Sequence, residues 1–194
     1  MRLACLAMVV GAIFAVRPLR ASELIPLPLS GAEAARRLAP LLATGDVLLL
    51  EPTPSGTFSQ ATVFANLPIP AAQAYGLIAD PSNYMRMSPS IDAIEVHERT
   101  SLGALFTSSI RVPFGHISTT VRMTFAGKQV IETRFAGGDL KTGSFRWQFV
   151  PDGGKSQAIY SLKTDIGESS WMVRKMVKAR PEMQFGGNAG TGLV

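Results

Sequence analysis

The sequence predicts an α+β domain in which about six to seven antiparallel strands form one sheet with helices against it. Three observations predict this class. Residues 62–94 place a strand, a proline-started helix and a proline-bounded aromatic turn in one order. From Ile91 onward, apolar and polar residues alternate with a period of two, and residues 169–178 return to helical spacing. A sheet with one dry face curves, so we expect the last helix to fill its concave side.

Residues 1–21 have the features of an export signal. Arg2 supplies a minimal positive region, and residues 3–16 form an uncharged apolar run, too short for a spanning helix of about 20 residues. We expect cleavage after Ala21. Because Leu19 is larger than the small residue preferred three positions before a cleavage site, an uncleaved anchor is the alternative. The protein is therefore expected to be exported, and periplasmic or membrane-associated.

Charge, cysteine and histidine content exclude several classes. Residues 1–21 hold three arginines and no acidic residue, so most of the net charge of +5 belongs to the leader. The rest of the chain is not basic enough to indicate nucleic-acid binding. Cys5, the single cysteine, lies in the same leader, which excludes disulfides and thiol catalysis in the mature chain. His97 and His116 fall on different predicted strands, neither at metal-ligand spacing. We predict no metal site, no cofactor and no catalytic residue.

Residues 22–57 are expected to form an N-terminal extension that packs on the main domain. Ser30 and Glu33 are spaced as a capping box, which predicts a short helix ending before Pro40. Residues 46–51 then predict a short strand.

The main domain, residues 58–194, is expected to start with one strand followed by two short helices. Pro68 and Pro70 end the strand and set the helix start, where a missing N–H costs nothing. Asp80, the residue before Pro81, ends the helix because that position is biased away from the α region. The apolar face of the helix is formed by Ala71, Ala74, Tyr75 and Ile78.

Six strands and a closing helix follow. Glycine-containing turns separate the strands, whose alternation is typical of antiparallel strands with one dry face. Ser169 or Ser170 can cap the closing helix. On that helix, Trp171 shares a side with Arg174, Lys175 and Lys178. An aromatic ring beside cations suits contact with a membrane surface, and a solvated basic face is the alternative.

Two segments carry a resemblance to a known superfamily. ANLPIPAAQAYGLIADPSNYMRMSPSI, residues 65–91, resembles the start of START-like, helix-grip (SRPBCC) domains of the polyketide cyclase and coenzyme Q-binding group, with Asp80, Tyr84 and Pro89 at the pattern positions. FRWQFVPDGGKSQAIYSLKTDI, residues 145–166, is similar to the late hairpin of that superfamily.

The resemblance implies a curved antiparallel sheet wrapped on a long C-terminal helix, with a mostly apolar cavity between them for lipids, quinones, sterols or polyketides. The chain departs from this pattern at Pro181, which interrupts the expected closing helix.

The expected cavity wall consists of inward-facing aromatic and aliphatic residues on the strands, with two residues of the turn above them. Methionine fills irregular shapes and aromatic rings give broad contact area. The same residues could form a solid core. The predicted ligand-binding residues are Tyr84, Met87, Phe106, Ile110, Met123, Phe125, Phe135, Phe145, Trp147 and Tyr160.

Three functions follow from this arrangement. The first is non-catalytic binding of a hydrophobic small molecule, lipid or isoprenoid quinone-like, with Arg111, Arg122 or Tyr160 orienting a polar head. The second is a polyketide cyclase or aromatase-type enzyme in which Tyr84, Asp80 or His116 performs acid–base work. The third is an interaction module with a collapsed core.

Overall fold

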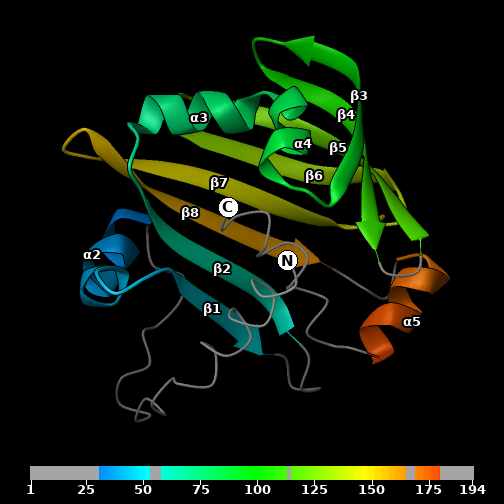
Figure 1. Cartoon of the computed structure of the whole chain (residues 1–194), viewed down its shortest axis with the longest axis horizontal. Helices are drawn as coiled ribbons and strands as arrows, with labels where there is room; N and C mark the ends of the chain where they lie inside the picture. The colour runs from blue at the N-terminus through cyan, green and yellow to red at the C-terminus, as the bar shows by residue number, and fades with distance from the viewer. Residues whose placement is uncertain (1–30, 53–57, 113–114, 165–168, 180–194) are drawn as a thin grey trace, which may run out of the picture. The chain divides into compact units, whose positions relative to one another are not determined.

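One eight-stranded antiparallel sheet dominates the part of the chain that the computed structural model describes, residues 31–52, 58–112, 115–164 and 169–179. The strand order is β1-β2-β8-β7-β6-β5-β4-β3 (Figure 1). The strands are β1 Val47–Pro52, β2 Phe58–Leu67, β3 Ile91–Thr100, β4 Gly103–Val112, β5 Gly115–Ala126, β6 Val130–Gly138, β7 Gly143–Asp152 and β8 Lys155–Thr164. The helices are α2 Gly31–Leu42, α3 Ala71–Ala79, the 3-10 turn Pro81–Asn83, α4 Tyr84–Met87 and α5 Trp171–Ala179.

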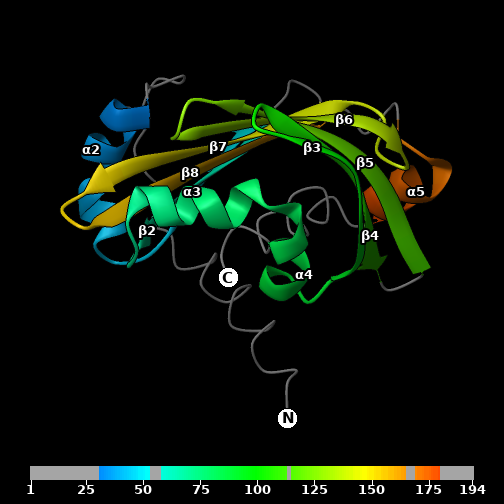
Figure 2. The ribbon, with the colours of Figure 1, turned by 90° about the horizontal axis from the view of Figure 1, so that it is seen from above.

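The predicted α+β class and antiparallel sheet are confirmed. The sheet has eight strands because β1, from the N-terminal extension, pairs with β2 along its length. The extension therefore supplies an edge strand of the main sheet. Figure 2 shows the sheet curving around α3 and α4, which lie on its concave side.

Local irregularities contribute to the curvature of the sheet. The register shifts twice in β3, between Ile91 and Ala93 and between Val96 and Glu98, and once between β5 and β6. Such bulges bend a strand and increase its twist. Gly138 ends β6 with a φ of +90°, and a Cβ there would lie 2.3 Å from the Ser118 carbonyl oxygen. Only glycine permits this approach of β6 to β5.

The α3 helix forms where the sequence predicts it. Pro70 is its extended N-cap, and Ala71 and Ala74 are buried against the sheet. Tyr75 contacts Phe125 and Phe149 edge-on, with ring centroids 6.1 and 6.3 Å apart. These contacts close the core beneath α3.

The helix α2 is longer than predicted. It continues through Pro40 to Leu42, whereas the sequence predicts an end before the proline. Leu38 and Leu42 are both buried, so packing of this apolar stripe outweighs the backbone hydrogen bond that proline lacks. Glu33 pairs with Arg37 at 2.7 Å, and Ser30, the other half of the predicted capping box, lies outside the described residues.

The described part of the C-terminal helix, α5, lies at one end of the sheet and not across its concave face (Figures 1 and 2). The Ser170 amide donates to the Asp139 carbonyl at 2.8 Å, which joins the start of α5 to the β6–β7 connection. Val173 is buried. Residues 171–179 therefore do not fill the concave side as expected, and Pro181, where the sequence predicts an interruption, lies outside the described residues.

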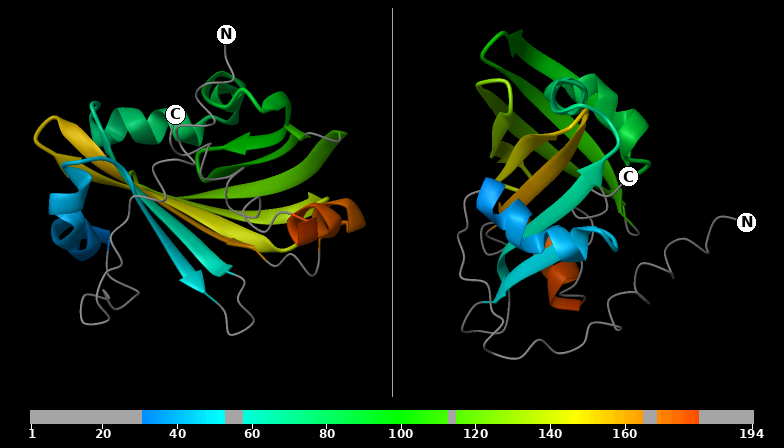
Figure 3. Two further views of the ribbon diagram at one scale, coloured as in Figure 1. Left: turned by 60° about the horizontal axis from the view of Figure 1, so that its bottom comes forward. Right: turned by 90° about the vertical axis from the view of Figure 1, so that its left-hand side faces the viewer.

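The helix α2 packs on the convex side of the sheet (Figure 3). Asn66 on β2 donates through its side-chain amide to the Leu42 carbonyl at 3.0 Å. The helix α2 therefore covers the convex face near β1 and β2, while the concave face toward α4 contains the pocket described next.

Candidate ligand-binding pocket

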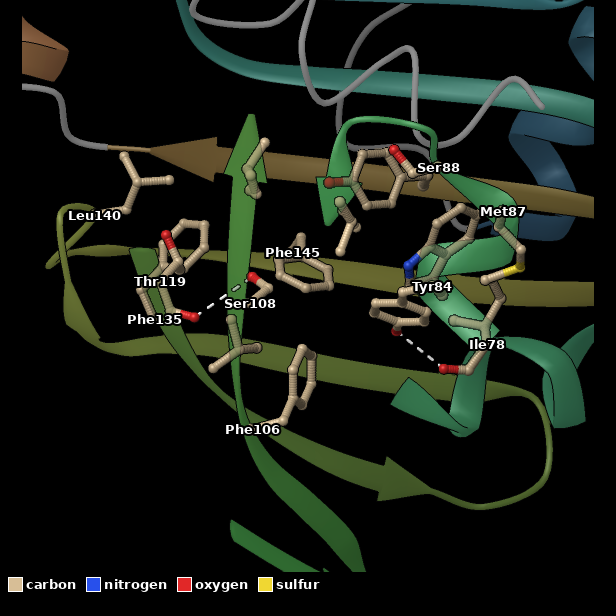
Figure 4. Close-up of a pocket in the computed structure, with 15 residues that line it drawn as sticks. Ile78, Tyr84, Met87, Ser88, Phe106, Ser108, Thr119, Phe135, Leu140 and Phe145 are labelled. Atoms are coloured by element: carbon tan, nitrogen blue, oxygen red, sulfur yellow. Dashed lines mark hydrogen bonds between the residues drawn. The ribbon is translucent and has the colours of Figure 1, made fainter. Parts of the chain in front are cut away.

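A pocket of about 90 Å³ lies between α4 and the concave face of the sheet (Figure 4). Figure 4 shows Ile78, Tyr84 and Met87 on one side and Thr119 and Leu140 on the other. The described residues that line it are Ile78, Tyr84, Met87, Ser88, Ile91, Phe106, Ser108, Ile110, Thr119, Val121, Phe135, Leu140, Phe145, Trp147 and Tyr160.

A row of aromatic rings on three adjacent strands forms much of the pocket wall. Phe135 on β6 lies 6.0 Å from Phe145 on β7, whose ring is 5.9 Å from Tyr160 on β8. Tyr160 in turn lies 4.5 Å from Trp147. Neighbouring strands place these rings side by side because their register pairs Trp147 with Tyr160.

Tyr84 closes the pocket from the helical side. Its hydroxyl donates to the Ile78 carbonyl at 2.9 Å, and its ring packs edge-on against Phe106, with centroids 5.6 Å apart. Burial raises the pKa of Tyr84 and of Tyr160, so both phenols stay protonated at neutral pH.

The other polar side-chain groups of the lining are the hydroxyls of Ser88, Ser108 and Thr119 and the indole N–H of Trp147. The Ser108 side chain donates to the Thr119 carbonyl at 3.4 Å, a long hydrogen bond. The Thr119 side-chain oxygen is buried and has no partner in the described structure. Of the described lining residues, none carries a charge.

Eight of the ten predicted ligand-binding residues line the pocket. The other two, Met123 and Phe125, lie farther along β5, where Met123 is buried and Phe125 packs against Tyr75 of α3. The strand is 12 residues long, so its inward face serves both the pocket and the closed core under α3.

Seven lining residues were not among those predicted. Ser108 stands in the inward alternation of β4, but its small polar side chain does not mark an apolar wall. Leu140 lies in the β6–β7 connection, where no periodic pattern operates. The other five are Ile78, Ser88, Ile91, Thr119 and Val121.

The groups proposed for acid–base work lie away from the pocket, apart from Tyr84. Asp80 accepts hydrogen bonds from the Ser82 side chain at 2.5 Å and the Ser82 amide at 3.1 Å, and it pairs with Arg99 at 3.1 Å. These contacts lower the pKa of Asp80, and the hydrogen bond from the Ser82 hydroxyl has the largest effect. His116 contacts the Asp92 carboxylate at 2.7 Å, and His97 contacts the Thr107 hydroxyl at 2.8 Å.

The arginines expected to orient a polar head also lie outside the pocket lining. Arg111 is 3.8 Å from the Asp92 carboxylate, and Arg122 is 3.2 Å from that of Glu98. Both side chains are exposed. Of the three groups expected to orient a head, the structure places Tyr160 alone at the pocket.

The residues of the predicted membrane contact are exposed on α5. Trp171 is 68% exposed, and the Lys175 ammonium lies 5.9 Å from its ring centroid. Arg174 donates to the Ser169 carbonyl. Within the described residues, no helix is long and apolar enough to cross a membrane, and no cluster of metal-ligating side chains occurs.

The sequence pattern of the family described as "Polyketide cyclase / dehydrase and lipid transport" matches residues 67–187, more than half of the chain. The chain belongs to this family. No curated protein matches it in sequence.

Solved structures share the fold. A protein from Thermus thermophilus is 15% identical, with a TM-score of 0.55 over 68% of this chain and 93% of that one. The Zhui aromatase/cyclase from Streptomyces is 17% identical, with a TM-score of 0.56 over 69% and 91%. A START superfamily protein from Mycobacterium smegmatis is 14% identical, with a TM-score of 0.51 over 68% and 94%. The domain therefore has the START-like, helix-grip fold.

Proposed function

We propose that the chain binds an uncharged hydrophobic small molecule, a lipid or an isoprenoid quinone-like compound, without converting it chemically. The observation that carries this proposal is the lining of the pocket: aromatic and aliphatic side chains with a few hydroxyls, and no charged group among the described residues. Such a lining favours burial of an apolar body and leaves a charged ligand without a partner. The family description, which includes lipid transport, supports it.

The size of the pocket bears on the mode of binding. An empty pocket of about 90 Å³ costs about 2 kcal/mol at about 24 cal/mol per Å³, which a domain tolerates. Pockets for drug-sized ligands measure about 300 Å³ or more. A full-sized lipid therefore displaces side chains on binding, and half-buried Met87, with its flexible thioether, is suited to move.

Native mass spectrometry of protein purified from its own host tests the proposal. We expect a co-purified apolar molecule that is absent from the variant Ile110→Lys, which places a charge in the dry pocket. Thr124→Lys, on an exposed position of β5, is the control and retains the molecule. A wild-type protein that carries no molecule and takes up no apolar probe contradicts the proposal.

The alternative is a cyclase-type enzyme, favoured by Tyr84, an acid–base group that lines the pocket. A phenol with a raised pKa that already donates to the Ile78 carbonyl is a poor proton donor to a substrate. Turnover of a polyketide by the wild-type protein, lost in Tyr84→Phe while probe affinity is retained, establishes the enzyme in place of the carrier.

Contact of α5 with a membrane surface is part of the same proposal, since Trp171 and three cations project from one helix. Anionic lipid vesicles should bind the protein more weakly when Trp171 is replaced by alanine. Equal binding of both proteins contradicts a role for Trp171.

A further inference from the structure

We propose that Thr119, with Ser108 beside it, forms a polar subsite at one end of the pocket that receives a single uncharged oxygen of the ligand, a carbonyl or a hydroxyl. This inference rests on the proposed binding function and specifies the ligand: an apolar body with one neutral oxygen.

The Thr119 hydroxyl is buried, yet nothing in the described structure bonds to it. The residue is 1% exposed, lines the pocket, and its side-chain oxygen has no hydrogen-bond partner among the described residues. Its register partners are Ser108 on β4 and Gly138 on β6. Because Gly138 has no side chain, the strand on that side offers Thr119 no polar group.

Ser108 can join Thr119 in holding a ligand hydroxyl. The Ser108 hydroxyl donates to the Thr119 carbonyl over a long 3.4 Å, and its lone pairs remain available to accept a hydrogen bond. A ligand carbonyl has no proton to give, so the Thr119 hydroxyl is the group that donates to it. Figure 4 shows Ser108 and Thr119 close together, on the side of the pocket away from Ile78 and Tyr84. When the ligand oxygen lies at this end, the apolar body of the ligand lies along the row of aromatic rings that includes Phe145, Tyr160 and Trp147.

The charge of the bound oxygen follows from the lining. A carboxylate or an ammonium group would lose its hydration without meeting an opposite charge among the described lining residues. A neutral carbonyl or hydroxyl loses far less, and it gains the hydrogen bond that Thr119 lacks.

An unpaired hydroxyl is not by itself a ligand site, and Thr133 supplies the comparison. Its side-chain oxygen is also buried and unpaired among the described residues, on β6, but Thr133 does not line the pocket. Replacement by valine keeps the shape of either residue and removes the hydroxyl. Thr133→Val is therefore a matched control for Thr119→Val.

The probes p-cresol and p-xylene have nearly equal shapes, but only p-cresol carries a hydroxyl. Their affinities, measured by titration calorimetry, separate the contribution of the hydroxyl to binding from that of the apolar body. We expect Thr119→Val to weaken p-cresol binding about three- to tenfold, the range of one hydrogen bond, and to leave p-xylene binding within about twofold. Thr119→Ser, which retains a hydroxyl, should restore p-cresol binding. Thr133→Val should change neither affinity.

The outcomes distinguish the subsite from the binding function. If Thr119→Val binds both probes as the wild-type protein does, the subsite is overturned and the carrier function stands. Equal losses for both probes overturn the subsite as well, since they indicate a change of shape. If the wild-type protein binds neither probe, the proposed function fails and the subsite fails with it.

Discussion

Trp147 and Phe149 are neighbours on the inward side of β7, and their rings stack in parallel 6.0 Å apart, yet their surroundings differ. Trp147 lines the pocket, whereas Phe149 is 1% exposed and lies in the closed core under Tyr75. Truncation of Phe149 leaves a new cavity, while truncation of Trp147 enlarges an existing one.

We therefore expect Phe149→Ala to lower the free energy of unfolding by about 3–5 kcal/mol and Trp147→Ala to lower it by clearly less. Trp147→Ala should in addition alter the affinity for an apolar probe. Urea denaturation and probe titration measure the two effects. A loss for Trp147→Ala as large as that for Phe149→Ala, with unchanged probe affinity, places Trp147 in a solid core.

Asp80 gives a pH-dependent prediction. Hydrogen bonds from Ser82, and then the charge of Arg99, lower the pKa of Asp80 in the folded protein. The stabilisation it provides is thus present above its unfolded pKa of about 3.9 and is lost as the pH falls below that value. Asp80→Ala should cost about 1 kcal/mol at pH 7, as for other helix caps, and the cost should shrink toward pH 3. Denaturation at both pH values measures it, and a cost that stays constant contradicts the assignment.

Among the elements, α2 tests whether the N-terminal extension belongs to the domain. Leu38 is 1% exposed between α2 and the convex face, and Arg37 beside it is exposed. Leu38→Ala should lower the free energy of unfolding by about 2–5 kcal/mol, whereas Arg37→Ala should change it by about 0.5 kcal/mol or less. Both variants should bind apolar probes normally, because the pocket lies on the other face. A single unfolding transition unaffected by Leu38→Ala would show that the extension folds separately.

The elements that could be predicted are those with a local cause. Period-two alternation gave the strands, because each side chain on one face of a strand meets the same surroundings. Pro70 and Pro81 marked the ends of α3 through backbone sterics alone. The continuation of α2 through Pro40 could not be predicted in this way, since burial of Leu42 depends on contacts with the distant β2.

The pocket was predicted in part for the same reason. Alternation identifies the inward side of a strand but not the position along it where a helix lies above, so Met123 and Phe125 were grouped with the residues under α4. Thr119, in contrast, was not among the predicted pocket residues. In the sequence it looks like any other strand threonine. The structure shows that it pairs with Gly138 and that its hydroxyl has no hydrogen-bond partner among the described residues.

At the scale of the whole molecule, export stays a prediction from the sequence, because the leader lies outside the described residues. The apolar run at residues 3–16 predicts a mature N-terminus near Ser22, or fractionation with membranes if the leader stays attached. Fractionation of the native host and determination of the N-terminal residue measure this. Full-length protein in the soluble cytosol contradicts it.

The two bulges of β3 have a consequence for the molecule at high concentration. An open sheet ends in strands with unpaired backbone groups, and such edges invite pairing between copies and then aggregation. Here β3 is one edge, bent at two places and bearing a row of exposed polar side chains: Glu95, His97, Glu98 and Arg99. Charge and irregular shape both oppose the docking of a second strand. The features that curve the sheet around its pocket therefore also oppose the pairing of a second copy at this edge.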